Sequence, residues 1–381
     1  MRTRHQPVGQ HATAVPLADC VDAFALHRSV PERYPFLLQS TATNPATGRF
    51  DIVFAAPRSA IVLGEIGELA DAGGFLNALD AAWQRESIAL TSTTLPFHGG
   101  WFLYLGYELA AEIEPTLSLR PDDCLPTAFA ARCTAAVVTD RLAGECWVVC
   151  EHGSDIDEAL IREDIAALKR RTETNSATPR TGLTVREESA TVFTDAVLRA
   201  KNYIAAGDVY QANLSRGWTA TFDGAVQPAD VYRRLRDANP GPFAGLVRWH
   251  DATILSSSPE RLLRLRDGTA ATRPIAGTRP RSDHRDTDES LSAELFANAK
   301  ERAEHVMLID LERNDLGRIC EPGSVEVDER MVLESYAHVH HIVSNVRGRL
   351  RRDVTPGAAI RAVFPGGTIT GCPKVRCMQI I

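Results

Sequence analysis

Apolar and polar residues in the first half of the chain recur at spacings that predict both strands and helices. Alternation over residues 49–55 predicts a strand that ends before Pro57, and residues 99–107 are typical of a buried strand with glycines near both ends. Residues 127–138 and 144–151 predict two more strands, joined by a turn. Because these strands follow one another without a regular alternation of strand and helix, we expect antiparallel sheets.

Helical periodicity marks two stretches of the first half, residues 73–85 and 155–171. The residues that we expect to face inward are Leu76, Leu79, Ala82 and Trp83 in the first helix, and Ile156, Leu160, Ile161, Ile165 and Leu168 in the second. Residues 172–188 are rich in Thr, Ser, Arg and Pro and lack apolar periodicity, so we interpret them as a linker. This interpretation divides the chain into an N-terminal region, residues 1–185, and a C-terminal region, residues 186–381.

The second half also mixes sheet and helix. Thr194 is a suitable N-cap for a helix that stops at Gly207, and a strand is expected over residues 208–215. Residues 289–311 are the longest helical stretch, and its expected inward residues include Leu291, Leu295, Ala299 and Ala303. The other expected elements are a short helix at 229–237 and strands at 244–249, 253–257, 261–266, 323–327 and 340–346.

The composition is that of an ordinary globular protein, with 44% hydrophobic and 24% charged residues among 381. A net charge of −7 argues against general binding to nucleic acids or membrane surfaces. No apolar run approaches the roughly 18 residues of a membrane span, and no apolar segment follows the charged N-terminus as in a signal peptide. Cys146 and Cys150 share one face of an expected strand, which suits buried, reduced thiols. We therefore expect a cytoplasmic protein.

Residues 364–376, near the end of the chain, have the sequence FPGGTITGCPKVR. Such a density of glycine and threonine predicts a loop whose backbone N–H groups and hydroxyls can approach a ligand closely. Lys374 and Arg376 follow where a helix can begin, so the stretch is suited to holding an anion. A Gly-Pro turn followed by a solvated basic helix face would explain the same residues.

Four upstream segments are also dense in functional residue types. They are SSSPER at 256–261, PIAGTRPR at 274–281, ERAEH to DLERNDLGR at 301–318, and HVHHIVS at 338–344. Together with residues 364–376, their order and wording resemble the chorismate-binding enzymes: anthranilate, aminodeoxychorismate, isochorismate and salicylate synthases. The resemblance runs from about residue 193 to the end, and it is looser in the first half.

The resemblance implies an α+β protein with a four-layer α/β/β/α fold, in which two large antiparallel sheets pack face to face with helices outside. It also implies a Mg²⁺-dependent site for chorismate between those layers. The chemistry is compatible, because a hard cation held by carboxylate oxygens can anchor the ring carboxylate and take up charge as the C4 hydroxyl leaves.

Three residues take catalytic or metal-binding roles from this resemblance. Glu304 matches the Mg²⁺ ligand, although its spacing also fits an exposed pair with Lys300. Glu260 matches an acidic residue at the substrate and metal site, and a strand-end pair with Arg261 is the alternative. His341 matches the histidine that assists departure of the hydroxyl, a general-acid role, and a satisfied core histidine would fit its position equally well.

The remaining matches concern the substrate. We expect Thr368 to act in catalysis with Glu260 and His341. The expected substrate-binding residues are Gln211, Gly277, Thr278, Gly367 and Lys374, the last through its attraction for a dianion. Strand alternation puts His338 and His340 on the face opposite to His341, so we do not expect a three-histidine metal cluster.

Two features indicate the nucleophile and the product. Relatives that add water have a lysine base where this chain has Gln211, and an amide cannot act as a base, which favours ammonia. The wording at 211–214, 258–261 and 50–52 resembles the aminodeoxychorismate synthases, and Gln39 replaces the acid of the Leu-Leu-Glu-Ser segment usual in the feedback site of anthranilate synthases. We therefore expect 4-amino-4-deoxychorismate, an intermediate of para-aminobenzoate and folate synthesis.

Ala276 keeps anthranilate synthase as the alternative. Some aminodeoxychorismate synthases have a nucleophilic lysine at this position, whereas anthranilate synthases have alanine, as here.

The resemblance also bears on partners and completeness. No segment is typical of a glutaminase, so a separate glutamine amidotransferase subunit is the implied source of ammonia. Family members continue beyond the equivalent of Ile381 through strands that contact the enolpyruvyl carboxylate and carry a second acidic Mg²⁺ site. The resemblance thus implies a chain that is truncated at its C-terminus, and a non-catalytic homologue is a further alternative.

Overall fold

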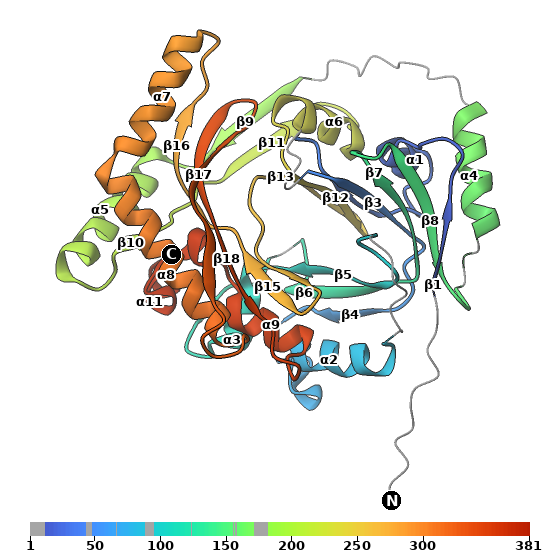
Figure 1. Cartoon of the computed structure of the whole chain (residues 1–381), viewed down its shortest axis with the longest axis horizontal. Helices are drawn as coiled ribbons and strands as arrows, with labels where there is room; N and C mark the ends of the chain where they lie inside the picture. The colour runs from blue at the N-terminus through green and yellow to red at the C-terminus, as the bar shows by residue number, and fades with distance from the viewer. Residues whose placement is uncertain are drawn as a thin grey trace, which may run out of the picture. The chain divides into compact units, whose positions relative to one another are not determined.

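The computed structural model describes residues 12–42, 48–65, 67–87, 95–122, 124–154, 156, 158–170 and 182–381 (Figure 1). The chain forms two compact units that do not follow chain order. Unit 1 comprises Met1–Gly106, Pro121–Ala177 and Pro228–Ser258, and unit 2 comprises Tyr107–Arg120, Thr178–Gln227 and Pro259–Ile381. The division near residue 185 thus remains a division of the sequence, since both halves of the chain contribute to each unit.

Unit 1 contains a seven-stranded antiparallel sheet and a three-stranded one. The order of the larger sheet is β1 (Ala12–Pro16), β8 (Glu145–Glu151), β7 (Ala135–Asp140), β3 (Phe50–Ala55), β2 (Phe36–Gln39), β12 (Phe243–Trp249) and β13 (Ala252–Ser258). The smaller sheet has the order β4 (Ala60–Leu63), β6 (Ala128–Cys133) and β5 (Gly100–Leu105). The single strand expected over residues 127–138 is therefore wrong, because Thr134 separates β6 from β7 and the two strands belong to different sheets.

Strand alternation gives the larger sheet two apolar faces, each covered by a different partner. Val137 and Val148 belong to one buried cluster, with residues of α1 (Ala23–Ser29) and α4 (Glu158–Arg170). Their neighbours Val138 and Val149 belong to a second cluster, which includes aromatic residues of the smaller sheet. The remaining helices of unit 1 are η1 (Ala70–Ala72), α2 (Phe75–Arg85) and α6 (Pro228–Ala238).

The predicted inward residues of α2 and α4 are largely confirmed. Leu76, Leu79 and Ala82 are buried, whereas Trp83 is 38% exposed and was wrongly placed. In the second stretch, the buried residues are Ile156, Ile161 and Ile165, and the partly buried Leu160 and Leu168 pack against them.

Unit 2 is organised around β18 (Val339–Arg349), which pairs antiparallel with three other strands. Along one edge, β18 pairs with β15 (Thr269–Thr272) and, at other residues, with β16 (Ile275–Pro280). Along its other edge it pairs with β17 (Glu326–Ser335). Figure 1 shows β17 and β18 as two long neighbouring strands. β14 (Arg264–Arg266) completes the sheet beside β15, so the α+β class with antiparallel sheets is confirmed.

Two short ribbons of unit 2 correct the expectations for residues 172–215. β9 (Leu183–Glu187) pairs with β11 (Trp218–Phe222), so the predicted linker ends in a strand, while residues 172–181 lie outside the described ones. The strand expected over 208–215 is reduced to β10 (Gln211–Ala212), which pairs with β19 (Gly371–Cys372).

The helices of unit 2 begin and end differently from the predictions. They are η2 (Tyr107–Leu109), α3 (Ala110–Ile113), α5 (Ala190–Ala206), α7 (Arg285–Ala297), α8 (Ala299–Gly317), α9 (Pro356–Val363), α10 (Gly367–Thr370) and α11 (Lys374–Ile380). α5 begins after Ser189 rather than at Thr194, and it ends at the left-handed Gly207 as expected.

The long helix expected over residues 289–311 is two helices, because Asn298 interrupts it. Asn298 has an extended backbone, and its Oδ1 accepts hydrogen bonds from the N–H groups of Lys300 at 3.0 Å and Glu301 at 3.2 Å. This side chain therefore caps a new helix, α8. Ala299 and Ala303 are exposed, and the buried residues of α8 are His305, Leu308, Ile309, Glu312, Asp315 and Leu316.

Two further predictions concern the cysteines and membrane-spanning helices. Cys146 and Cys150 are buried and form no disulfide, as predicted. Among the residues that the structure describes, no helix combines the length and the apolar character needed to cross a membrane.

Arg132 is a buried cation near the end of β6 in unit 1. Its guanidinium group donates to the carboxylates of Glu86 and Glu151, each at 2.7 Å, and to the backbone oxygens of Gly100 and Cys133. Burial raises the pKa of Glu151, and the positive charge of Arg132 opposes that shift. Without Arg132, the buried Glu151 carboxylate would lose its hydrogen-bonded ion-pair partner.

We expect Arg132→Met to lower the free energy of unfolding by about 3–5 kcal/mol, the usual cost of breaking a buried ion pair. Chemical denaturation of the purified chain measures this difference. Arg85→Met, a change at an exposed residue at the end of α2, should have an effect within about 0.5 kcal/mol. Equal effects of the two substitutions would contradict the assignment.

Candidate functional site

The short ribbon of β10 and β19 joins the glycine-rich stretch to a segment about 160 residues earlier in the chain. Gln211 lies opposite Cys372, and the N–H of Asn213 donates to the oxygen of Thr370 at 3.0 Å. Gly371 makes this approach possible, because its φ is +128° and a Cβ there would collide with the oxygen of Gln211. Only glycine therefore fits this position.

Glu304 and Gln211 meet across this junction. Nε2 of Gln211 donates to Oε1 of Glu304 at 3.0 Å, so the alternative pairing of Glu304 with Lys300 is not the contact observed. Oε1 of Gln211 is buried and has no hydrogen-bond partner among the described residues. An amide oxygen without a partner, next to a carboxylate, provides oxygen atoms that a hard cation prefers.

Thr368 and Glu260 form a second contact. The Thr368 hydroxyl on α10 donates to Oε1 of Glu260 at 2.5 Å, and the amide nitrogen of Asn213 donates to the backbone oxygen of Thr368. Burial raises the pKa of Glu260, and the hydrogen bond from Thr368 opposes that shift. Gly367 packs so closely on α8 that a Cβ there would collide with Leu311.

His341 lies at a register shift between β16 and β18. It is directly opposite Thr278, whose Oγ1 lies 3.0 Å from Nδ1 of His341. The shift occurs at Gly277, which has a φ of +74°. His341 is 8% exposed, and burial lowers its pKa, while Gly277 and Glu334 act in the opposite direction.

His340 and His341 of the HVHH segment lie on opposite faces of β18, as predicted. His340 contacts Oγ of Ser335 at 2.7 Å and Oδ1 of Asp288 at 3.0 Å, away from Thr278. His341 and His340 thus have separate partners on the two faces of β18.

Lys374 is the first residue of α11, which begins where the sequence suggested a helix. Its Nζ donates to Oδ2 of Asp315 at 2.6 Å and to the oxygen of Val363 at 3.2 Å. Asp315 is 1% exposed, so Lys374 neutralises a buried carboxylate. Its attraction for a dianionic substrate stays a prediction.

Sequence reasoning missed Glu312, a second buried carboxyl group on α8. It is eight residues after Glu304, a helical spacing that puts both on one face, and this spacing was available from the sequence. Burial and, secondarily, the charge of Asp315 raise the pKa of Glu312 to about 7. A Cβ on Gly367 would lie 3.5 Å from Oε1 of Glu312, so this group borders the glycine-rich stretch.

His305, also on α8, was missed as well. It is fully buried, its Nε2 lies 2.7 Å from Oγ of Ser344, and burial lowers its pKa to about 4. These contacts are those of a core histidine that remains neutral.

Within the described part of the chain, no group of three or more His, Cys, Asp or Glu side chains could hold a metal ion. Mg²⁺ does not require such a group, because it commonly takes one or two carboxylates and completes its octahedron with water and substrate oxygens. Glu304 and the unpartnered oxygen of Gln211 fit that requirement.

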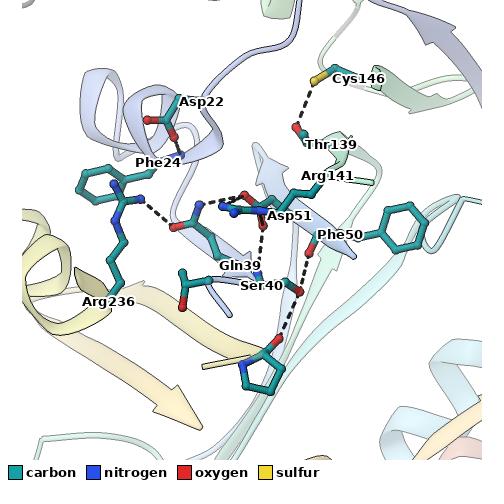
Figure 2. A network of polar contacts seen from close by, with 12 residues as sticks. Asp22, Phe24, Gln39, Ser40, Phe50, Asp51, Thr139, Arg141, Cys146 and Arg236 are labelled. Carbon is teal, nitrogen blue, oxygen red and sulfur yellow. Dashed lines mark hydrogen bonds and ion pairs between the residues drawn. The ribbon is translucent and has the colours of Figure 1, made fainter. Parts of the chain in front are cut away.

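A separate polar network in unit 1 surrounds Gln39 and is drawn in Figure 2. Nε2 of Gln39 donates to Oδ2 of Asp51 at 3.0 Å, and Arg236 donates to its Oε1 at 3.2 Å. Arg141 donates to both oxygens of Asp51 at 2.8 Å, and the Ser40 N–H donates to Oδ1. A glutamate at position 39 would place a like charge against the buried Asp51, whereas glutamine donates to it.

The chain is similar to known proteins in sequence and in fold. The family model described as chorismate binding enzyme matches residues 36–381. An anthranilate synthase component I-like protein of Synechocystis sp. is 40% identical over 342 residues, which cover 89% of this chain and 69% of that protein. Aminodeoxychorismate synthase component 1 of Bacillus subtilis is 41% identical over 309 residues, which cover 79% and 65%. The chain thus spans about two thirds of the length of these relatives.

A solved structure gives the same picture for the fold. The crystal structure of anthranilate synthase component I from Streptococcus pneumoniae matches with a TM-score of 0.74 and 28% identity. The match covers 89% of this chain and 77% of that one.

We expect the buried carboxyl of Glu312 to make stability depend on pH. Its folded pKa, about 7, lies above the ordinary value of 4.5, so its favourable contribution is complete below pH 4.5 and is lost as the pH rises through 7. The free energy of unfolding of Glu312→Gln, taken relative to that of the parent, should therefore be higher at pH 8 than at pH 5. We expect this increase to be on the order of 1–3 kcal/mol. Denaturation at both pH values measures this. Asp310→Asn, on the exposed side of α8, should show the parent's pH dependence, and parallel curves for all three proteins would refute the assignment.

Proposed function

Because the chain belongs to the family of chorismate binding enzymes, we propose that it replaces the C4 hydroxyl of chorismate with an amino group from ammonia. The product would be 4-amino-4-deoxychorismate, which retains the enolpyruvyl group and serves para-aminobenzoate and folate synthesis. The observation that carries this proposal is the contact between Gln211 and Glu304.

Gln211 occupies the position at which the water-adding relatives have a lysine base. Its amide has no basic atom, so it cannot remove a proton from water. The amide nitrogen is already directed at Glu304, at 3.0 Å. Ammonia has its own lone pair and needs no general base for attack, which makes it the nucleophile that this site would accept.

His341 would assist the leaving group. If the Thr278 hydroxyl donates to Nδ1, the proton of the neutral imidazole lies on Nε2, from which it can pass to the departing C4 hydroxyl. Burial lowers the pKa of His341, so the neutral form predominates at pH 7 and the tautomer determines its role. In the net reaction a C–N bond replaces the C4–O bond, and the hydroxyl leaves as water.

Once the C–N bond has formed, Glu260 would take up a proton from the positively charged nitrogen of the adduct. Burial raises its pKa above the ordinary value for a glutamate, which strengthens it as a base, and Thr368 fixes its orientation through the 2.5 Å hydrogen bond. Gly367, Gly277 and Thr278 would contribute backbone and hydroxyl contacts to the substrate.

Glu304, together with Oε1 of Gln211, would hold Mg²⁺. The bound ion would supply positive charge to the ring carboxylate of chorismate as the C4–O bond breaks. The chain's own residues would position that carboxylate through the junction of β10 and β19.

The choice of product is supported by unit 1. Gln39 bridges Asp51 and Arg236, and its amide suits the buried Asp51 better than the glutamate usual in anthranilate synthases would. Anthranilate synthesis is the second candidate, favoured by Ala276 and by the relatives that are named anthranilate synthase component 1.

A partner is part of the proposal. The similar proteins are named as components, and this chain has no segment typical of a glutaminase. We therefore infer that a glutamine amidotransferase subunit supplies the ammonia in the cell.

Incubation of the protein with chorismate, an ammonium salt and Mg²⁺, followed by mass analysis, identifies the product. We expect a species that retains the enolpyruvyl group and carries one amino group in place of a hydroxyl. Release of pyruvate with formation of anthranilate would assign the protein to the second candidate. Formation of isochorismate would instead show that water is the nucleophile.

Glu304→Gln should weaken Mg²⁺ binding by at least about tenfold, because a carboxylate ligand becomes a neutral amide. Calorimetric titration with Mg²⁺ measures this without turnover. Asp310→Asn removes a carboxylate from the exposed side of the same helix and serves as the control. Equal Mg²⁺ affinity in the parent protein and Glu304→Gln would exclude Glu304 as a ligand.

A further inference from the structure

A pocket in unit 2 that the proposed function does not use is lined by four arginines. It has a volume of about 300 Å³, and Arg261, Arg264, Arg266 and Arg347 border it together with Asp267 and Asp328. Such a volume lies at the small end of the range for ligand sites.

Strand register explains how this hollow forms. Arg264 of β14 lies opposite Ala271 of β15, and Ala271 lies opposite Arg347 of β18. Residues directly opposite one another in antiparallel strands point to the same face. The small side chain of Ala271 therefore lies between two arginines and leaves an open space between them.

The other face of these strands packs on the core. Ala270 and Val346, the neighbours of Ala271 and Arg347, are fully buried in a cluster with Ile309 and Leu316 of α8. The arginines are thus fixed on a supported sheet. Six residues of β18, about 20 Å, separate Arg347 from His341, whereas Arg261 directly follows Glu260 of the candidate site.

The charges that line the pocket are not balanced. Four guanidinium groups face Asp267 and Asp328, and Glu326 at the edge of the pocket also pairs with Arg347, which leaves an excess of one positive charge. Arg347 pairs with Asp328 at 3.1 Å and with Glu326 at 2.9 Å, and Arg266 is 3.5 Å from Asp267. In the described part of the chain, neither Arg261 nor Arg264 has an ion pair or a hydrogen bond to a side chain.

Arg261 is the least well compensated cation of the pocket. Its Nε is buried and has no hydrogen-bond partner among the described residues. Burial, with the nearby charges of Arg264 and Arg273, lowers its pKa to about 10, and the charges of Glu334 and Glu329 oppose that shift only in part. A buried cation without a partner is unfavourable, and an anion in the pocket would remove that penalty.

We propose that this pocket binds a small anion through a phosphate group, held by Arg261 and Arg264. The planar guanidinium fork matches phosphate oxygens and donates two parallel hydrogen bonds. The anion would balance the excess of positive charge around these two arginines. The volume admits a phosphate group with a short organic substituent, such as a three-carbon phosphate ester.

Titration calorimetry of the full chain with inorganic phosphate at pH 8, at constant ionic strength against sodium chloride, tests this. We expect saturable phosphate binding that chloride does not reproduce. Arg264→Gln should weaken binding by about tenfold or more, because a charge-assisted hydrogen bond is lost. Arg313→Gln removes the same charge from the exposed side of α8 and should bind like the parent. Arg264 is exposed, so its replacement is not expected to affect folding.

Two further ligands identify the chemistry. If glycerol 3-phosphate binds more tightly than inorganic phosphate, the pocket accepts a phosphate ester. If glycerol 3-phosphate binds more weakly, the pocket is a site for free phosphate. Both results support a phosphate site. Succinate that binds as tightly as phosphate would overturn the phosphate assignment. Phosphate heats equal to those of chloride, or an Arg264→Gln variant with the parent's affinity, would overturn the site. Each readout is a binding constant, so failure here is distinguishable from failure of chorismate turnover.

Discussion

The approach of Gly371 to the backbone of Gln211 is the contact on which the candidate site depends. It pairs two residues of β10 with two of β19, which is a very small ribbon. The absence of a side chain at Gly371 permits the pairing, since any Cβ would meet the oxygen of Gln211. Through this pairing, Gln211 reaches Glu304, and the stretch that carries Thr368 is held beside Glu260.

The helix α8 supplies most of the charge around this junction. Its inward face carries carboxyl groups where a helix in a globular protein would ordinarily bury apolar side chains. Asp315 is neutralised by Lys374, whereas burial shifts Glu312 toward its protonated form. The cost of burying a charged carboxylate is thus lowered by an ion pair at Asp315 and by protonation at Glu312, one turn apart. Both effects reduce the net negative charge that the helix contributes to the site.

Much of the fold followed from local patterns, and the failures have identifiable physical causes. The alternation that separates His340 from His341 was predictable, because it depends only on strand geometry. The break at Asn298 was not predicted, since apolar periodicity continues across it and the cap is a single side-chain interaction. Likewise, Thr194 had the right chemistry for a cap, but Ser189 starts the helix earlier.

The roles of the candidate site residues stay predictions, and their pairings could not be predicted from the sequence. The resemblance supplied Glu260, Glu304, His341 and Thr368, whereas their partners come from distant segments that no local pattern connects. Lys374 illustrates this, because its partner Asp315 lies 59 residues away and changes it from a free cation to half of a buried pair. The arginine pocket could not be predicted from the sequence either, because Ala271 lies between Arg264 and Arg347 only when three strands are paired in register.

The cap at Asn298 has a consequence for how this chain tolerates insertions and deletions. α8 starts at a fixed residue, so the rotational phase of every later position is counted from that start, at about 100° per residue. One residue added between Asn298 and Glu304 would turn Glu304 away from Gln211 and bring a neighbour into its place. Length changes in the first two turns of α8 are therefore incompatible with the site.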